Sequence, residues 1–226
     1  MTARLLAVDT ETTGLRPDEG HRVVEIGCVE LRNNVPTGRT WHTFVNPRRD
    51  IPEKARQVHG LSEEFLADKP TFEEIADQFV EFLGESPLLF HNAPFDLGFL
   101  DAELARVGQG GVSSGREILD TMELAGGFVT LNNLCRRHGI DLAVRRHRHG
   151  ALIDAQLLAE VYIEMTGGRQ GSFLLDTTPV ATGLQAETAA EANWPERRYV
   201  PDENEARAHR AMLQGLPNPI WKKYLD

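Results

Sequence analysis

A short apolar run that ends in two acidic residues constrains the fold of this chain more than any other stretch. Residues 5–8 are all apolar, too few for a helix, and a Thr-Thr-Gly turn signal begins at Thr12. We therefore predict a short strand that is buried on both faces. Because side chains of a strand alternate between its faces, Asp9 and Glu11 would point the same way where this strand leaves the core.

Two neighbouring carboxylates at the end of a strand have two interpretations. They can be solvated acids at the edge of the core, which is the common case for an isolated Asp-x-Glu pattern. Alternatively they share a divalent cation, because like charges in a partly desolvated site raise each other's pKa unless an opposite charge compensates them. The remaining motifs of the chain favour the second interpretation.

The composition excludes several classes of protein. The 226 residues are 41% hydrophobic and 26% charged, which is typical of one globular domain with an appendage. No apolar run reaches the ~18 to 20 residues of a membrane span and no secretion signal is evident, so we expect a cytoplasmic protein without membrane contact. Two cysteines are too few for a disulfide framework. The net charge of −10 argues against broad binding of phosphate backbone.

Strand and helix patterns follow one another along the first part of the chain. Residues 23–29 and 41–45 read as strands that can form an antiparallel meander with the first strand. A T-x-x-E capping box at Thr71 and apolar residues at helical spacing predict an amphipathic helix over 72–83. Residues 119–138 read as two shorter helices. These patterns predict an α/β fold.

Two further carboxylates stand at predicted helix starts. The strand predicted over 87–91 is followed by Pro94, which suits the first turn of a helix and puts Asp96 near its N-terminus. A lone Asp at that position commonly serves only the helix dipole. Asp154 begins the core-facing stripe of a helix predicted over 151–165, where a carboxylate is costly without a partner.

A histidine precedes the last of these carboxylates. His149 lies five residues before Asp154, and five helical residues would rotate it ~140° away. Both side chains can serve one site only if His149 lies in the loop before the helix, and Gly150 allows that break. His147 is the alternative histidine. A basic cluster surrounds the histidines and is either a solvated face or a means of steering phosphate; it consists of Arg136, Arg137, Arg145, Arg146 and Arg148.

Four carboxylates and one histidine are the parts needed for two-metal hydrolysis of a phosphodiester. Hard oxygen ligands select Mg²⁺ or Mn²⁺. Two such ions ~3.5 to 4 Å apart stabilise the attacking and leaving oxygens, and a histidine with a pKa near neutrality can accept the proton of the attacking water. The parts in question are Asp9, Glu11, Asp96, Asp154 and His149.

Three motifs carry these side chains in order along the chain. They are Asp9-Thr10-Glu11-Thr12-Thr13-Gly14, His91-Asn92-Ala93-Pro94-Phe95-Asp96 and His149-Gly150-Ala151-Leu152-Ile153-Asp154. They resemble the three motifs of the DEDDh exonucleases. The resemblance implies the ribonuclease H-like α/β fold of that family, a mixed sheet flanked by helices, here with a flexible C-terminal tail. Within this family the chain is most similar to the proofreading branch that serves bacterial replicative DNA polymerases.

The resemblance implies an activity and a role for each motif residue. It implies 3′→5′ removal of nucleotides from a DNA 3′ end, with two Mg²⁺ or Mn²⁺ ions in the active site. Asp9, Glu11 and Asp154 would be metal ligands, Asp96 would complete the site partly through water, and His149 would be the general base. The pocket for the terminal nucleotide would be lined by Thr10, Gly14, Leu15, His59 and Asn92.

The composition changes after the third motif. We predict an exonuclease domain over 1–168, a clamp-binding segment with a flexible linker over 169–200, and a polymerase-binding tail over 201–226. An exposed Gln followed by small and apolar residues resembles the short peptides that bind the bacterial sliding clamp. The contact residues of this segment would be Gln170, Ser172, Phe173 and Leu175.

The end of the chain carries large apolar residues without an evident core. Such residues are typical anchors for a partner, here the polymerase subunit that the exonuclease would serve. The tail could instead fold back on its own domain. Its helix-start signal begins at Asp202, and the anchor residues would be Ile220, Trp221, Tyr224 and Leu225.

Two other functions share parts of this pattern. An exoribonuclease that trims RNA or degrades short oligonucleotides has the same catalytic site but usually lacks a linker with terminal anchors. A non-catalytic adaptor between a polymerase and another factor needs the tail, but it does not explain why five polar side chains of a catalytic site are present. A small accessory subunit bound to the domain is compatible with either nuclease.

Overall fold

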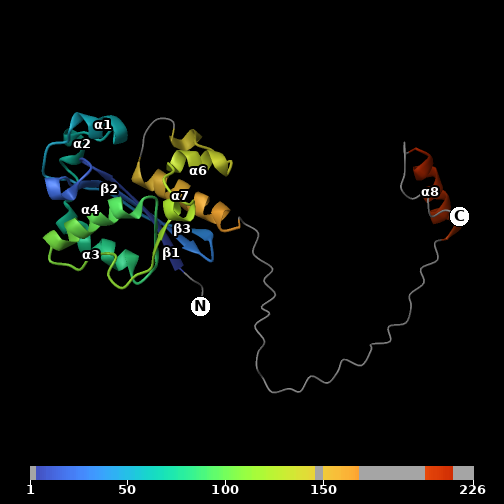
Figure 1. Ribbon diagram of the computed structural model, residues 1–226, viewed down its shortest axis with the longest axis horizontal. Coiled ribbons are helices and arrows are strands. Elements are labelled where there is room, and N and C mark those ends of the chain that lie inside the picture. The colour runs from blue at the N-terminus through green and yellow to red at the C-terminus, as the bar shows by residue number, and fades with distance from the viewer. Residues whose placement is uncertain (1–3, 146–149, 168–201, 216–226) are drawn as a thin grey trace, which may run out of the picture. The chain divides into compact units, whose positions relative to one another are not determined.

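The computed structural model describes residues 4–145, 150–167 and 202–215. The chain divides into two units, Met1–Leu174 and Leu175–Asp226, which are described separately (Figure 1). Several predicted functional residues lie outside the described residues, namely His149, the clamp-binding Gln170, Ser172, Phe173 and Leu175, and the polymerase-binding Ile220, Trp221, Tyr224 and Leu225.

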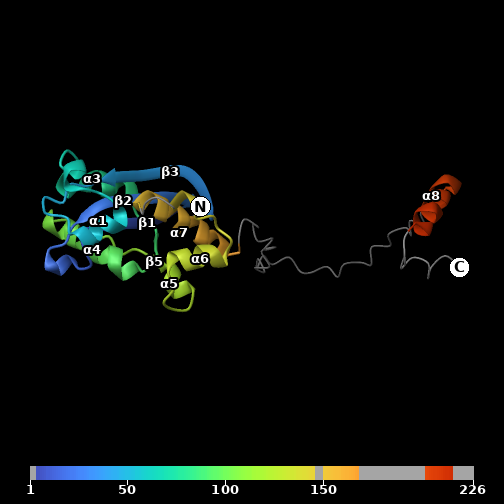
Figure 2. The same ribbon diagram turned by 90° about the horizontal axis from the view of Figure 1, so that it is seen from above.

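The first unit is built on a five-stranded sheet with the order β3-β2-β1-β4-β5. Figure 2 labels β3, β2, β1 and β5 of this sheet. β1 (Arg4–Thr12), β2 (Val23–Arg32) and β3 (Val35–Phe44) form the predicted antiparallel meander. β4 (Leu88–Phe90) pairs in parallel with β1, and β5 (Ile118–Asp120) pairs in parallel with β4. The prediction of a mixed sheet is confirmed.

Helices cover both faces of this sheet (Figure 1). Leu6 and Val8 of β1 pack against α3 (Phe72–Leu83) and α4 (Ala93–Arg106). Leu5 and Ala7 point to the opposite face and pack against α6 (Leu131–Arg137) and α7 (Ala151–Met165). β1 is therefore buried on both faces, as its apolar run predicts.

Shorter helices complete the first unit. They are η1 (Pro17–Glu19), α1 (Glu53–His59), α2 (Glu63–Leu66), α5 (Thr121–Leu124) and η2 (Ala143–Arg145). The two helices predicted between 119 and 138 are present as α5 and α6, but the start of that segment belongs to β5, so the helical prediction is wrong there. A strand of three residues is too short to show an alternating pattern.

Local capping signals set the helix starts as predicted. At the start of α3, the backbone N–H of Thr71 donates to Glu74 Oε2 at 2.7 Å, which is half of a capping box. In the second unit, α8 (Glu203–Gln214) begins after Asp202, whose carboxylate accepts from the backbone N–H of Glu205 at 2.8 Å. None of the helices in the described part of the chain has the length and apolar character that a membrane span requires.

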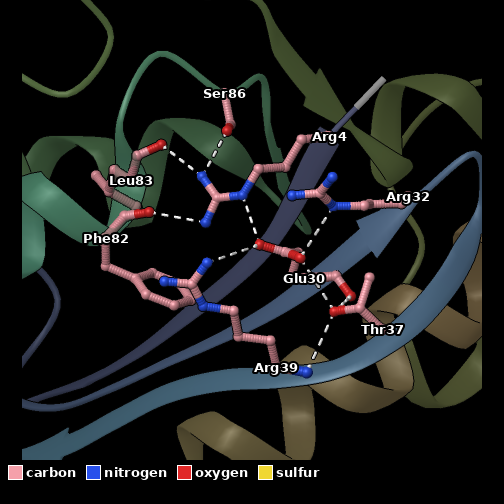
Figure 3. Close-up of polar contacts among 8 residues, drawn as sticks. All are labelled: Arg4, Glu30, Arg32, Thr37, Arg39, Phe82, Leu83 and Ser86. Atoms are coloured by element: carbon pink, nitrogen blue, oxygen red, sulfur yellow. Dashed lines mark hydrogen bonds and ion pairs between the residues drawn. The ribbon is translucent and has the colours of Figure 1, made fainter. Parts of the chain in front are cut away.

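A buried ion pair between Arg4 of β1 and Glu30 of β2 is linked through Arg4 to the end of α3 (Figure 3). Glu30 Oε2 accepts from Arg4 Nε at 2.6 Å, and the other two nitrogens of that guanidinium donate to Phe82 O, Leu83 O and Ser86 Oγ at 2.7 to 3.1 Å. Arg4 therefore satisfies carbonyl groups at the C-terminal end of α3. Burial by itself would raise the pKa of Glu30, but hydrogen bonds from Arg4 and Thr37 outweigh burial and hold that pKa below its ordinary value.

Candidate active site

Two carboxylates project from β1 toward the start of α7. Asp9 lies opposite Gly27 of β2, and Glu11 lies opposite Glu25, so the strand continues to Thr12 and the acids lie within it rather than after it. One carboxylate oxygen from each of Asp9, Glu11 and Asp154 lies within 4.8 Å of the other two. The three carboxylates therefore lie close together as predicted, and their role as metal ligands stays a prediction.

A glycine in β2 allows Asp154 to reach this group. A Cβ atom at Gly27 would lie 2.4 Å from the backbone of Ala151 and Leu152, so a side chain there would collide with the first turn of α7. Asp154 lies in that first turn of α7. The turn follows Gly150, whose backbone is extended. The contact was not predicted, although a glycine inside a strand often marks a close backbone approach.

The fourth carboxylate is held by the backbone of β1. Asp96 Oδ1 accepts from Thr10 N at 2.9 Å and from Thr10 Oγ1 at 2.7 Å, and it is buried in the first turn of α4, which Pro94 opens as predicted. Asp96 is not one of the three carboxylates grouped within 4.8 Å. Its contact with the site runs through Thr10, a residue for which we predicted a substrate contact.

The electrostatics of this group call for a cation. Burial raises the pKa of Asp9 well above its ordinary value, and the charges of Asp96, Asp154 and Glu11 raise it further. Burial is also the main reason that the pKa of Glu11 rises to about 8 and that of Asp96 to about 7. Because oxygen donors this close together repel one another when ionised, the donor set fits a hard divalent cation.

An arginine of the basic cluster lies in the site rather than on a solvated face. Arg145 Nη2 donates to Asp154 Oδ2 at 2.6 Å, and the Arg145 side chain is 12% exposed. The same guanidinium contacts Asn132 of α6. By contrast, Arg136 bonds its helical neighbour Asn133 at the surface. The structure therefore places one cation of this cluster against the carboxylates.

A cavity of about 370 Å³ opens beside these carboxylates. Of the predicted substrate-binding residues, it includes only Asn92, which has a left-handed φ of 71°. The backbone N–H groups of Asn92 and Ala93 donate to the carboxylate of Asp120 at 3.0 and 2.8 Å, which fixes this turn. The lining residues are Asp9, His91, Asn92, Met122, Phe128, Val129, Thr130, Leu131, Asn132, Arg145 and Asp154.

Of the other predicted pocket residues, Gly14 and Leu15 lie in the loop after β1, and His59 is the last residue of α1. Gly14 packs so closely on the His21 ring that an added Cβ would lie 2.3 Å from it, and Leu15 next to it is 80% exposed. His59 is buried, and its Nδ1 accepts from Leu61 N at 3.0 Å. Burial lowers the pKa of His59, and the charge of Glu25 opposes that shift. None of the three lines the cavity, so their contact with substrate stays a prediction.

One acidic residue near the site was missed by the sequence analysis. Glu25 is buried opposite Glu11, and His42 Nε2 lies 2.7 Å from its carboxylate. Its charge helps to raise the pKa of Glu11. The available signal was a single acidic residue inside the apolar stretch 23–29, which demands a partner.

Comparisons with known proteins agree with this geometry. The family model described as "Exonuclease" matches residues 6–162. The fold resembles the nuclease domain of 3′hExo, a DEDDh family member bound to rAMP, with a TM-score of 0.63 at 17% identity over 73% of this chain and 92% of that one. It also resembles exonuclease X in complex with 5′ overhanging duplex DNA, with a TM-score of 0.56 at 26% identity over 72% of this chain and 90% of that one.

Similarity to bacterial sequences extends beyond the exonuclease domain. The chain is 42% identical to the DNA polymerase III subunit epsilon of Rickettsia felis, covering 94% of this chain and 96% of the relative. It is 39% identical to the protein of that name from Escherichia coli, covering 82% of this chain and 77% of the relative. The chain belongs to the exonuclease family and, within it, to the proteins named DNA polymerase III subunit epsilon.

Proposed function

We propose that this chain is the metal-dependent 3′→5′ exodeoxyribonuclease that removes misincorporated nucleotides during replication by DNA polymerase III. The observation that carries the proposal is the group of carboxylates of Asp9, Glu11 and Asp154 within 4.8 Å of one another. Its substrate is a DNA 3′ end. Membership of the exonuclease family supports the reaction class.

The carboxylates have distinct tasks in this proposal. Asp9, Glu11 and Asp154 hold two Mg²⁺ or Mn²⁺ ions, and Asp96 completes the site from its position on Thr10. When bound, the metals polarise the scissile phosphate and stabilise the charge that develops on the attacking and leaving oxygens. Asp96 keeps the backbone of β1 in place between the two metal-binding acids of that strand, because it accepts from both Thr10 donors.

The activity is tested with 3′-labelled oligonucleotides. The full chain is incubated with matched DNA, with mismatched DNA and with RNA of the same sequence, each in Mg²⁺, in Mn²⁺ or in EDTA. We expect metal-dependent shortening of DNA from the 3′ end. Undiminished digestion in excess EDTA would refute the metal mechanism, and preference for RNA would favour the exoribonuclease function instead.

The general base is proposed to be His149, which lies outside the described residues. His149→Ala should lower turnover by ~10² to 10⁴-fold with little change in metal affinity, because positioned proton transfer typically contributes that much. His147→Ala is the matched control and should have a small effect. If the two variants give the reverse result, the base is His147.

The segment from Gln170 to Leu175 is proposed to bind the beta sliding clamp. Gln170 would hydrogen-bond in a polar pocket while Phe173 and Leu175 fill an apolar one, with Ser172 as the small spacer. Calorimetry compares the wild type with the Gln170→Ala/Phe173→Ala double variant. Equal affinity of the two proteins for the clamp would reject this assignment.

The tail is proposed to bind the DNA polymerase III alpha subunit. Its anchors would be Ile220, Trp221, Tyr224 and Leu225, beyond the capped helix α8. Tethering would keep the exonuclease at high effective concentration beside a stalled primer end. A chain that ends at Leu184 should keep nuclease activity on single strands and lose co-purification with the alpha subunit. Loss of folding or of intrinsic activity would show that the tail belongs to the core.

A further inference from the structure

An aromatic side chain stands exposed at the rim of the catalytic cavity. Phe128 is 89% exposed, the largest exposed fraction among the large apolar side chains in the described part of the chain. It lines the same cavity as Asp9 and Asp154. Most of the ring is in water at the mouth of a charged cavity, where a ligand bound in the cavity would cover it.

The backbone around Phe128 is ordered on both sides. Before it, α5 ends in a Schellman motif, in which Gly126 N donates to Glu123 O at 2.9 Å and Gly127 N donates to Met122 O at 3.1 Å. Gly126 and Gly127 have φ values of 85° and 140°, which favour glycine. The ring is therefore presented by a turn that two glycines make possible.

The residues after Phe128 attach this turn to the fold. Val129 packs against the core that α6 and α7 share. Thr130 is the N-cap of α6, and its Oγ1 accepts from Asn133 N at 3.3 Å. With a core contact on one side and hydrogen-bonded helix ends on both, the backbone that carries the ring is held in place before a ligand arrives.

We propose that Phe128 stacks on a nucleobase of the DNA strand whose phosphate lies at the carboxylates. This inference rests on the proposed function and adds a substrate-binding residue to it. A volume of about 370 Å³ is within the range of small-molecule sites. Stacking on an aromatic ring suits an enzyme that must accept any base, because every base has a π-face.

The charge of the site supports a nucleobase rather than a protein partner. The wall beside Phe128 contains the carboxylates of Asp9 and Asp154 and the guanidinium of Arg145, which suit metals and phosphate. An apolar protein segment would have to desolvate these groups, whereas a nucleotide matches the ring with its base and the charges with its phosphate.

Leu124 provides a matched control in the same segment. It is 51% exposed at the end of α5, four residues before Phe128, but it does not line the cavity. Substitution of either residue removes a solvent-exposed apolar side chain and should leave folding unchanged. Only Phe128 is placed to touch a base.

The test measures kcat and KM of the full-length wild type, Phe128→Ala, Phe128→Trp and Leu124→Ala on single-stranded DNA in Mg²⁺. Base–aromatic stacking is worth ~1 to 3 kcal/mol, so Phe128→Ala should raise KM about 5- to 150-fold. Phe128→Trp and Leu124→Ala should remain near the wild type. Thermal unfolding confirms that all four proteins are folded.

Abasic substrates identify the stacked base. Oligonucleotides with one abasic site at the terminal, second or third position from the 3′ end are compared between wild type and Phe128→Ala. At one position the abasic site should make the two proteins equal. Unchanged KM in Phe128→Ala, or an unchanged difference between the proteins on all three abasic substrates, would overturn the inference. Absence of any DNA hydrolysis by the wild type would instead refute the proposed function.

Discussion

The two ends of the β1–β2 pair surround their carboxylates with different charges. At one end, Glu30 has ion pairs with Arg4 at 2.6 Å, Arg32 at 3.3 Å and Arg39 at 3.7 Å. At the other end, Asp9 and Glu11 approach Asp154 within 4.8 Å, and the charge of Arg145 opposes the rise of the Asp9 and Glu11 pKa values.

The pKa values follow the balance of charge. The pKa of Glu30 lies below its ordinary value because its arginines outweigh burial, whereas the pKa of Glu11 rises to about 8 because burial and neighbouring acids outweigh Arg145. The same two strands thus carry a compensated carboxylate that fastens the fold and carboxylates whose charge Arg145 offsets only in part, which suits a metal cation. Substitutions at the Glu30 end should therefore change stability, and substitutions at the Asp9 end should change catalysis.

The largest effect is expected from Asp9→Asn. Loss of a metal ligand should lower hydrolysis by ~10³-fold or more, since a catalytic metal supplies several kcal/mol to the transition state. The metal-free variant should unfold no more easily than the wild type, because one repelling charge has been removed. Single-turnover hydrolysis and urea unfolding measure the two effects. Activity that survives in Asp9→Asn would contradict the assignment of this carboxylate.

Glu30→Ala should have the converse effect. Removing the carboxylate leaves the Arg4 guanidinium, whose side chain is 20% exposed, without its ion pair and should lower the free energy of unfolding by ~3 kcal/mol. The kcat should stay unchanged. Arg39→Ala is the matched control, because Arg39 is exposed and its ion pair with Glu30 is long, at 3.7 Å. It should lower the free energy of unfolding by less than ~1 kcal/mol. A loss of kcat in folded Glu30→Ala protein would show that the two regions are coupled.

Gly27→Ala should disturb the boundary between the two regions. Its Cβ would lie 2.4 Å from the backbone of Ala151, so α7 must shift, and overpacking of this kind costs ~1 to 3 kcal/mol. Because Asp154 moves with α7, kcat should fall by up to ~10²-fold. Denaturation and kinetics on the same preparation check both effects. Wild-type kcat in this variant would mean that the carboxylates tolerate the shift.

The pH dependence of stability should show the raised pKa values. Since the pKa of Glu11 rises from its ordinary 4.5 to about 8, the folded protein binds more protons than the unfolded chain between these values. The free energy of unfolding in EDTA should therefore fall by ~3 to 4 kcal/mol as the pH rises from about 5 to about 8. Glu11→Gln should reduce this fall, and saturating Mg²⁺ should oppose it. Stability that increases with pH in EDTA would contradict the shift.

Local patterns were sufficient to predict the elements that carry the carboxylates. The helix over 151–165 was predicted from apolar spacing and Gly150, and α7 has these bounds. Pro94 likewise indicated the start of α4 and the place of Asp96. The strand β5 escaped detection because three residues show no period.

The sequence by itself determined which carboxylates are present, on which side of each element they lie, and the family to which the chain belongs. Side-chain periodicity and caps are local properties, so they can be read without a fold. The tertiary structure alone decided that Gly27 admits α7, that Arg145 lies on Asp154, and that Phe128 stands over the cavity. The geometry of these contacts depends on strand register and helix packing, which no local pattern encodes.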